Sequence, residues 1–285
     1  MAAICLVWGL NFVVTRWVVT DGGVPPLFFA GIRFLGATLV LLPFLRPVPK
    51  NLGTLFAISM GIGVFNFSFM FVGLANAEAS AVSVVAQLLV PFAVLMSVAF
   101  LGERIGWRRG AGIALAIAGT GLIVFDPVTF QMSTGLIFVA FAAFFASGAS
   151  ILMKRIPPMG TLQMQAWIGL FSFAPLFVAS ALFEPAGDGV TALLYGGWLI
   201  WLAVAFVVLM VSIFAQGLYY YLIKTYDVSL VSPLTIMAPV WGVILGVSLL
   251  NEPLTYRLAL GATISLAGVY IILVRGNRGN QAGGS

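Results

Sequence analysis

Charged residues are spaced so widely along this chain that most of it has to lie in an apolar solvent. Nine intervals of 15 residues or more contain no Lys, Arg, Asp or Glu, and residues 22–45 are interrupted only by Arg33. A helix needs about 20 predominantly apolar residues to cross the hydrocarbon of a bilayer. The intervals therefore predict ten transmembrane spans, numbered here in chain order, with approximate limits 2–20, 26–45, 52–73, 79–101, 108–125, 132–153, 160–183, 197–223, 228–250 and 256–274.

Helical spans are favoured over the strands of a membrane barrel. The apolar intervals lack the alternation of apolar and polar residues that a barrel strand requires. A helix also satisfies its backbone hydrogen bonds within one segment, as the bilayer interior demands. The predicted fold class is therefore all-α and integral to the membrane.

The scarcity of polar side chains excludes most enzyme classes. Charged residues make up 7% of the chain, against roughly a quarter in soluble proteins. The chain has no His and one Cys, Cys5, so zinc centres, Ser-His-Asp triads and disulfide frameworks cannot be built. We expect no enzymatic activity, no cofactor and no metal site.

The distribution of basic residues predicts the orientation in the membrane. Cytoplasmic loops collect Lys and Arg, and ten such residues follow the even-numbered spans: Arg46, Lys50, Arg104, Arg108, Arg109, Lys154, Arg155, Lys224, Arg275 and Arg278. The opposite loops hold Arg257 and six acids: Asp21, Glu78, Asp126, Glu184, Asp188 and Glu252. We predict that both termini are cytoplasmic in a cell (inner) membrane. Topology then explains the net charge of +5 without a nucleic-acid partner.

The two halves of the chain resemble each other. A shift of 149 residues places 78–83 on 227–232 and 101–103 on 250–252, and a shift of 132 places Pro25, Pro26 and Pro43 on Pro157, Pro158 and Pro175. The repeat unit has five helices, an odd number, so the second copy crosses the membrane in the opposite sense. We predict inverted repeats at residues 1–127 and 128–275 and a disordered tail at 276–285. In transporters, such repeats place a substrate site near the bilayer midplane at their interface.

Four short motifs give the chain a resemblance to a known family. They are Trp8-Gly9-Leu10-Asn11-Phe12, Arg33-Phe34, Leu101-Gly102-Glu103 and Asn251-Glu252-Pro253. With them the chain resembles the EamA-type members of the drug/metabolite transporter superfamily over essentially its whole length, and it is most similar to YddG-like amino-acid exporters. The resemblance implies a central cavity surrounded by spans one to four and six to nine, with spans five and ten at the periphery.

Polar and aromatic residues near span centres are the candidates for contact with a substrate, because an unpaired polar group in hydrocarbon costs free energy. The predicted binding residues are Trp8, Asn11, Asn66, Met70, Gln87, Gln163, Trp167, Gln216, Tyr219, Met237 and Trp241. Amide groups set among aromatic and thioether surfaces suit small amphipathic solutes. The alternative is that each residue binds one helix to another within the membrane.

Arg33 is the one charged residue well inside a predicted span. As a member of the predicted site, it would hydrogen-bond a substrate carboxylate. As a structural residue, it would pair with Glu78 or with backbone carbonyls of an adjacent helix. Its repeat counterpart is Gln165, so the symmetry of the repeat does not require a cation. Arg16, nearer a span end, is expected to extend towards the interface.

Pro91 in span four and Pro239 in span nine fall near span centres at almost equivalent repeat positions. Each removes a backbone hydrogen bond and bends its helix. We predict that they are the hinges of a rocking motion, with static kinks as the alternative.

The sequence as a whole predicts a transporter that exports small amphipathic metabolites, in particular neutral or aromatic amino acids, by alternating access. No Asp or Glu lies at a span centre, which disfavours a carboxylate proton relay and favours transport driven by the solute gradient. The expected partners are a small-molecule substrate and the lipid bilayer, with no requirement for an oligomer. The alternatives are a carrier of other small solutes, such as drugs or nucleosides, and a non-transporting membrane scaffold subunit.

Overall fold

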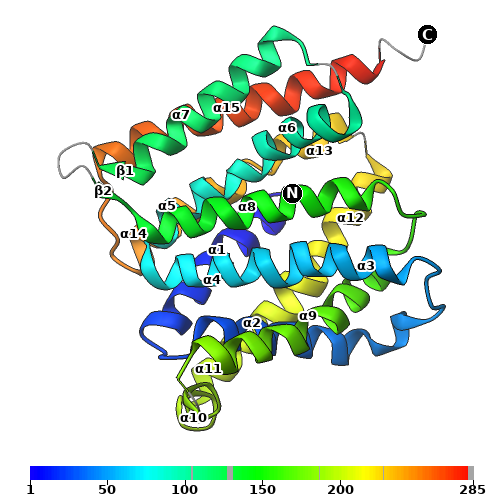
Figure 1. Ribbon diagram of the computed structural model, residues 1–285. Coiled ribbons are helices and arrows are strands. Elements are labelled where there is room, and N and C mark those ends of the chain that lie inside the picture. The colour runs from blue at the N-terminus through cyan, green and yellow to red at the C-terminus, as the bar shows by residue number, and fades with distance from the viewer. Residues whose placement is uncertain (104, 127–130, 186, 227, 282–285) are drawn as a thin grey trace.

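The structure, a computed structural model, describes residues 1–103, 105–126, 131–185, 187–226 and 228–281. Helices form nearly all of it (Figure 1). The elements up to span five are α1 (Ala2–Thr20), α2 (Pro26–Leu41), η1 (Leu42–Leu45), α3 (Leu52–Ser59), η2 (Met60–Asn66), α4 (Phe67–Asn76), α5 (Ala79–Val85), η3 (Ala86–Leu88), α6 (Leu89–Leu101) and α7 (Trp107–Val124). The remaining elements are β1 (Phe125–Asp126), β2 (Gln131–Met132), α8 (Thr134–Met153), α9 (Thr161–Phe183), α10 (Asp188–Tyr195), α11 (Trp198–Ala205), η4 (Phe206–Ala215), α12 (Gln216–Thr225), α13 (Val228–Leu234), α14 (Met237–Leu249) and α15 (Tyr256–Gln281).

The predicted fold class is confirmed. Within the described ranges, nine helical runs are long and apolar enough to cross a membrane. The one predicted span outside these nine is span five, which corresponds to α7 and packs along α15 at the edge of the bundle (Figure 1). Most observed limits lie within three residues of the predicted ones, although the sequence did not indicate α10.

Close packing of small residues explains the position of α7 and α15 at the periphery. A Cβ added to Gly119 would collide with the backbone nitrogen of Ser265, and one added to Gly112 would lie 2.9 Å from the carbonyl oxygen of Gly268. Such small residues allow two membrane helices to approach each other closely. The hydroxyls of Thr120 and Ser265, 3.2 Å apart, share a hydrogen bond across this contact.

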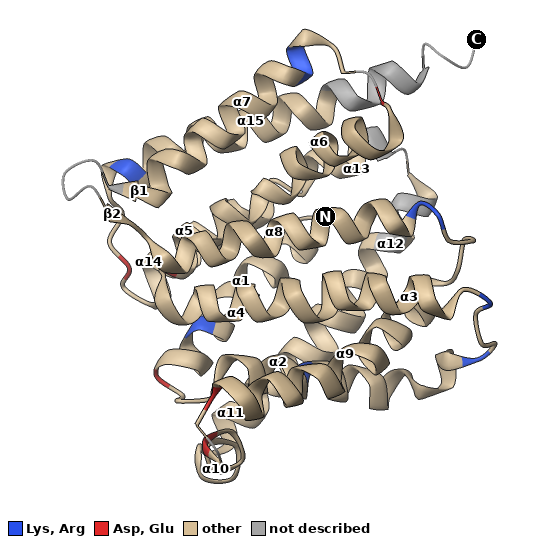
Figure 2. Cartoon of the chain, viewed as in Figure 1, with Lys and Arg blue, Asp and Glu red and all other residues tan. Residues whose placement is uncertain are grey.

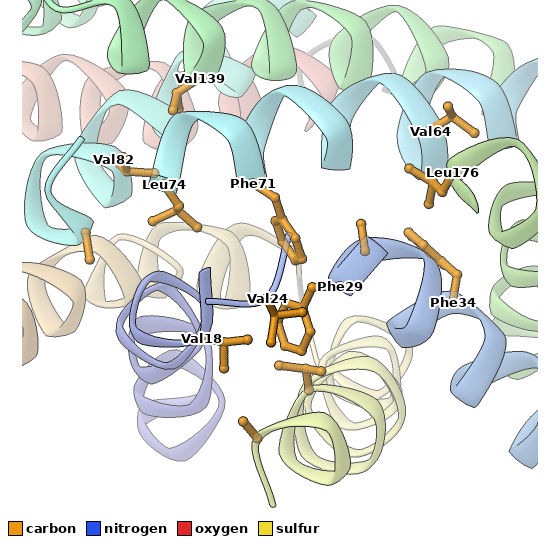
Figure 3. Close-up of a cluster of buried hydrophobic side chains, with 14 of the residues drawn as sticks. Val18, Val24, Phe29, Phe34, Val64, Phe71, Leu74, Val82, Val139 and Leu176 are labelled. Carbon is orange, nitrogen blue, oxygen red and sulfur yellow. The ribbon is translucent and has the colours of Figure 1, made fainter. Parts of the chain in front are cut away.

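The main helix pairs of the bundle each join the two halves of the chain. Helix α2 packs on α9, α1 on α14 and α4 on α8. The apolar core therefore contains residues from both halves, as the close-up in Figure 3 shows for Phe29, Phe71, Val139 and Leu176. Phe29 and Phe71 are stacked, with their ring centroids 5.7 Å apart.

Two kinds of backbone irregularity recur in both halves. Spans three and eight each contain a π-helical stretch, η2 and η4, and a shift of 149 places residues 60–66 on 209–215, within η4. Spans four and nine are each interrupted, at η3 and at the turn of residues 235–236. Pro91 and Pro239 explain these interruptions, because a proline cannot donate to the carbonyl four residues earlier, here that of Gln87 and that of Thr235. The predicted bends thus lie one turn before each proline.

Parts of the predicted domain organisation lie outside the described residues. These are the boundary between the repeats, at residues 127 and 128, and the end of the tail, at residues 282–285. Helix α15 continues to Gln281, into the segment predicted to be a disordered tail. Next to the boundary, β1 pairs with β2 in antiparallel register, with Phe125 opposite Met132.

Candidate functional site

The buried guanidinium of Arg33 is the centre of the candidate site. Arg33 lies in α2 with 6% of its surface exposed. Its Nε donates to Ser212 Oγ at 3.1 Å, and its Nη1 donates to Asn11 Oδ1 at 3.4 Å. Its Cζ lies 4.6 Å from the centroid of the Phe67 ring, a cation–π contact. Residues from α1, α2, α4 and η4 therefore meet here, and η4 belongs to the second half.

The partners of this cation are electrically neutral. Within the described part of the chain, Arg33 donates to Ser212 and Asn11 and forms no ion pair with a carboxylate. Side-chain oxygens and an aromatic ring hold it, in place of Glu78 or the backbone carbonyls considered from the sequence. A guanidinium carries five N–H donors, and a buried charge without a counter-ion costs several kcal/mol. An anionic group that reached Arg33 would therefore gain a strong charge-assisted hydrogen bond.

The π-helical stretch of span eight positions Ser212. Its hydroxyl donates to the carbonyl of Val207, five residues earlier, at 2.8 Å, and accepts from Arg33. A five-residue spacing between donor and acceptor matches the wider turn of a π-helix, and such turns are frequent at functional sites. The widened turn thus supplies a hydroxyl that is already oriented towards the guanidinium.

Aromatic rings lie next to Asn11 on span one. Trp8, one helical turn from Asn11, meets Tyr219 of α12 edge to face, with ring centroids 5.2 Å apart. Gly9 lets α1 approach α14 closely, because a Cβ there would lie 2.6 Å from the Cβ of Trp241. Of the residues predicted from the sequence, the structure brings Trp8, Asn11, Arg33, Tyr219 and Trp241 to these contacts between the halves.

Three other predicted residues are held by contacts within the protein: two by hydrogen bonds to backbone carbonyls, and Trp167 by burial of its indole. The amide of Asn66 donates to the carbonyl of Ala142 in α8 at 2.9 Å. The amide of Gln163 donates to the carbonyl of Pro47, in the connection after span two, at 2.7 Å. Trp167 is 7% exposed and packs on Phe171, and its Nε1 has no hydrogen-bond partner within the described ranges.

The remaining predicted residues lie near the backbone irregularities. Gln87 is in η3, Gln216 begins α12 and Met237 begins α14, while Met70 packs against the apolar core from α4. All four are half-buried. Their positions keep them candidates for contact with a solute.

We call the end of the bundle with the loops at Asp21, Glu78, Glu184 and Glu252 the acidic end, and the end with the loops at Lys50, Glu103 and Lys154 the basic end. In Figure 2 most red segments lie at the left of the bundle and blue loops lie at the right. Two carboxylates cap helices at the acidic end. Glu252 accepts from the backbone nitrogens of Ala79 and Ser80 at 2.6 and 2.9 Å, and Glu184 accepts from those of Leu27 and Phe28 at 2.6 and 3.0 Å.

Arg16, which we expected to extend towards the interface, contacts groups at the acidic end. Its Nη1 donates to the carbonyls of Leu74 and Ala77, and its Nε lies 3.5 Å from Glu252 Oε1. The last carbonyls of a helix have no partner within the helix, so those at the end of α4 can accept from this side chain. Burial and the Glu252 carboxylate raise the pKa of the neighbouring Glu78 above its ordinary value, although Arg16 opposes the rise.

Comparison with known proteins identifies the family. The model of the EamA-like transporter family matches residues 1–125 and 133–274. This chain belongs to the EamA-like transporter family. A protein of Escherichia coli K12 named "Probable amino-acid metabolite efflux pump" is 30% identical over 276 residues, which cover 94% of this chain and 91% of that protein. The "Uncharacterized inner membrane transporter YedA" of the same strain is 29% identical, covering 92% of this chain and 86% of its own.

A solved crystal structure has the same fold as this EamA-like transporter. It has a TM-score of 0.60, a sequence identity of 22% and coverage of 97% of this chain and 96% of its own. At this identity the likeness concerns the fold alone. The family match and the named relatives indicate a multi-pass membrane transporter and not an enzyme.

Sequence reasoning missed two residues of the Arg33 site, Ser212 and Phe67. Both lie inside long apolar stretches, where a lone Ser or Phe carries no signal of its own. A search for polar residues inside spans would have returned Ser212 together with several other buried serines, such as Ser59 and Ser172. Only packing distinguishes the serine that faces the guanidinium.

Proposed function

We propose that this transporter exports small amphipathic metabolites, in particular neutral and aromatic amino acids, across the inner membrane by alternating access. The observation that carries the proposal is the buried Arg33, held by neutral groups between helices of both halves. The name of the E. coli relative, an amino-acid metabolite efflux pump, supports the same substrate class.

The chemistry around Arg33 fits the two parts of an amino acid. Its carboxylate would accept hydrogen bonds from the guanidinium in a charge-assisted pair. The apolar side chain would lie against Trp8 and Tyr219, whose edge-to-face contact lies one turn along α1 from Asn11. Phosphorylated solutes fit less well, because they favour several cations and Arg33 is the one charge deep in a predicted span.

The matched irregularities of the two halves support a rocking mechanism. Bending at the interruptions before Pro91 and Pro239 would exchange one arrangement of the repeats, residues 1–127 and 128–275, for its mirror arrangement. All eight acids of the sequence lie outside the nine membrane-spanning runs of the described chain. The gradient of the solute itself is therefore the simplest driving force.

The proposed orientation places the basic end and both termini in the cytoplasm, because Lys and Arg collect in cytoplasmic loops. Labelling of single cysteines at Lys50 and Arg155 from each side of the membrane tests this placement. Both positions should react from the cytoplasmic side, and reaction of the two from opposite sides would contradict the topology.

The purified protein in liposomes loaded with labelled phenylalanine, leucine or glutamate tests the function. We expect phenylalanine and leucine to leave faster than from protein-free liposomes. If drugs or nucleosides leave while no amino acid does, the protein is a carrier with a different substrate. If nothing leaves under any gradient, the scaffold alternative is supported and the proposal is wrong.

A further inference from the structure

The turns that end spans four and nine have the same backbone geometry. Gly102 and Asn251 are equivalent under the shift of 149, and both have left-handed backbones, with φ of 67° and 53°. The next residue donates its N–H to the carbonyl six residues earlier: Glu103 to Ser97 at 3.4 Å and Glu252 to Gly246 at 3.3 Å. Each glutamate therefore starts from the same position relative to its own helix.

At the acidic end, the carboxylate of Glu252 joins span nine to span four. Its side chain is 5% exposed, and it accepts from the first backbone N–H groups of span four, at Ala79 and Ser80. Gly246 makes room for it, because a Cβ on Gly246 would lie 2.5 Å from Glu252 Oε2. The free N–H groups at the start of a helix favour a carboxylate partner.

At the basic end, the equivalent carboxylate has a different environment. The side chain of Glu103 is 39% exposed, and it lies 3.0 Å from Lys154 Nζ at the end of span six. This ion pair corresponds to the pair between Glu252 and Arg16 of span one, 3.5 Å apart. Both copies of the repeat thus hold a glutamate beside a cation, but Glu252 is buried in its position as a helix cap and Glu103 remains open to solvent.

We propose that Glu103 and Glu252 are alternating latches that decide which end of the transporter is closed. In the arrangement described here, Glu252 caps span four and closes the acidic end. In the opposite arrangement, Glu252 leaves, and Glu103 caps span nine at the backbone N–H groups of Val228 and Ser229, the equivalents of Ala79 and Ser80. This inference rests on the proposed alternating access and names the residues that stabilise its two states.

The exchange keeps the two states close in free energy. Each state has one span capped by a latch glutamate, so the gain at one end offsets the loss at the other. A ligand needs only a modest difference in affinity to shift such an equilibrium.

Thiol labelling at two equivalent serines measures the two states. Ser83, at the acidic end, is 0% exposed, and its counterpart Ser232 is half-buried. We would introduce Ser83→Cys or Ser232→Cys into a Cys5→Ser background, since Cys5 is the sole native thiol, and follow the reaction with a hydrophilic maleimide. Loss of a helix cap shifts an equilibrium about fivefold. Glu252→Gln should therefore speed labelling at position 83 and slow it at position 232 by about that factor, and Glu103→Gln should do the reverse.

Two further variants test the assignment. Gly246→Ala, whose Cβ displaces the Glu252 carboxylate, should reproduce the labelling of Glu252→Gln. Glu184→Gln removes a cap of the same geometry on α2. The counterpart of Glu184 under the shift of 132 is Leu52, so no second carboxylate can exchange with this cap. Both labelling rates should therefore remain within twofold of the background.

The result that overturns the latches is a Glu103→Gln protein that labels like the background at both positions, or two glutamate variants that shift labelling in the same direction. Labelling needs no substrate. Reciprocal shifts in a protein that moves no amino acid would therefore uphold the latches and contradict the proposed substrate. Amino-acid flux without reciprocal shifts in labelling would uphold the proposed substrate and contradict the latches.

Discussion

Spans three and eight both widen into a π-helix at equivalent positions, yet the two stretches present different side chains. In span eight, Ser212 points its hydroxyl at Arg33. In span three the equivalent residue is Gly63, where an added Cβ would collide with Ser172 Oγ of α9. The counterpart of Arg33 itself is the neutral Gln165.

The comparison separates two properties of the repeat. The backbone irregularities are shared, as the proposed rocking of both halves requires. The polar groups are not shared. Arg33, the cation that we propose to bind the substrate, is therefore present in the first half only. Substitutions that exchange residues between equivalent positions can therefore test each property separately.

We expect the largest effect on transport when Arg33 is replaced by glutamine, the residue at the equivalent position in the second half. Arg33→Gln should slow the exit of labelled phenylalanine from liposomes about 30-fold, because a hydrogen bond to a charged group contributes ~2 kcal/mol. Gln165→Ala is the matched control and should stay within twofold of the unmodified protein. Undiminished flux in Arg33→Gln together with a lower Tm would assign Arg33 a structural role only.

A methyl group at the other π-helical stretch should affect stability. Gly63→Ala forces the Cβ into Ser172, and overpacking of this kind costs about 1–3 kcal/mol. The Tm of the purified protein should fall, and Ser172→Gly in the same chain should restore most of it. Equal Tm values for Gly63→Ala and the unmodified protein would contradict the close contact between η2 and α9.

A smaller effect is expected at Trp167, whose counterpart is Leu35. Trp167→Phe keeps an aromatic ring but removes the Nε1 donor, which has no partner among the described residues. An unsatisfied buried donor costs about 1–3 kcal/mol, so the Tm should hold or rise. The apparent affinity for substrate should fall a few-fold if this donor meets a solute. Unchanged affinity would remove Trp167 from the site.

The smallest effect concerns the acidic end and depends on pH. The raised pKa of Glu78 means that its protonated form is favoured in the folded protein. The stability linked to this proton is complete below the ordinary value of 4.5 and is lost as the pH rises through the raised value. Glu78→Gln, permanently neutral beside Arg16 and Glu252, should therefore have a higher Tm than the unmodified protein at pH 7. This difference in Tm should disappear as the pH approaches 4. A difference in Tm that grows on acidification would contradict the raised pKa of Glu78.

Most of the span limits followed from the sequence, because a span is recognised by its own hydropathy and length. The interruptions near Pro91 and Pro239 were also predictable, since the missing N–H is a property of one residue. The π-helical stretches were not, because neither stretch contains a proline or a charge that marks it. Nor were the cap made by Glu252 on Ala79 and the hydrogen bonds of Arg16 to the end of α4, which depend on helix ends contributed by distant spans.

Taken alone, the sequence determined that this protein lies in a lipid bilayer, how many spans it has and that they form an inverted repeat. Charge spacing, apolar length and repeat period can be read directly along the chain. The tertiary structure decided which buried polar groups meet. Arg33 and Ser212 are separated by 179 residues in the chain and lie in different halves. Their contact exists only because the halves pack against each other and because a widened helical turn orients one hydroxyl.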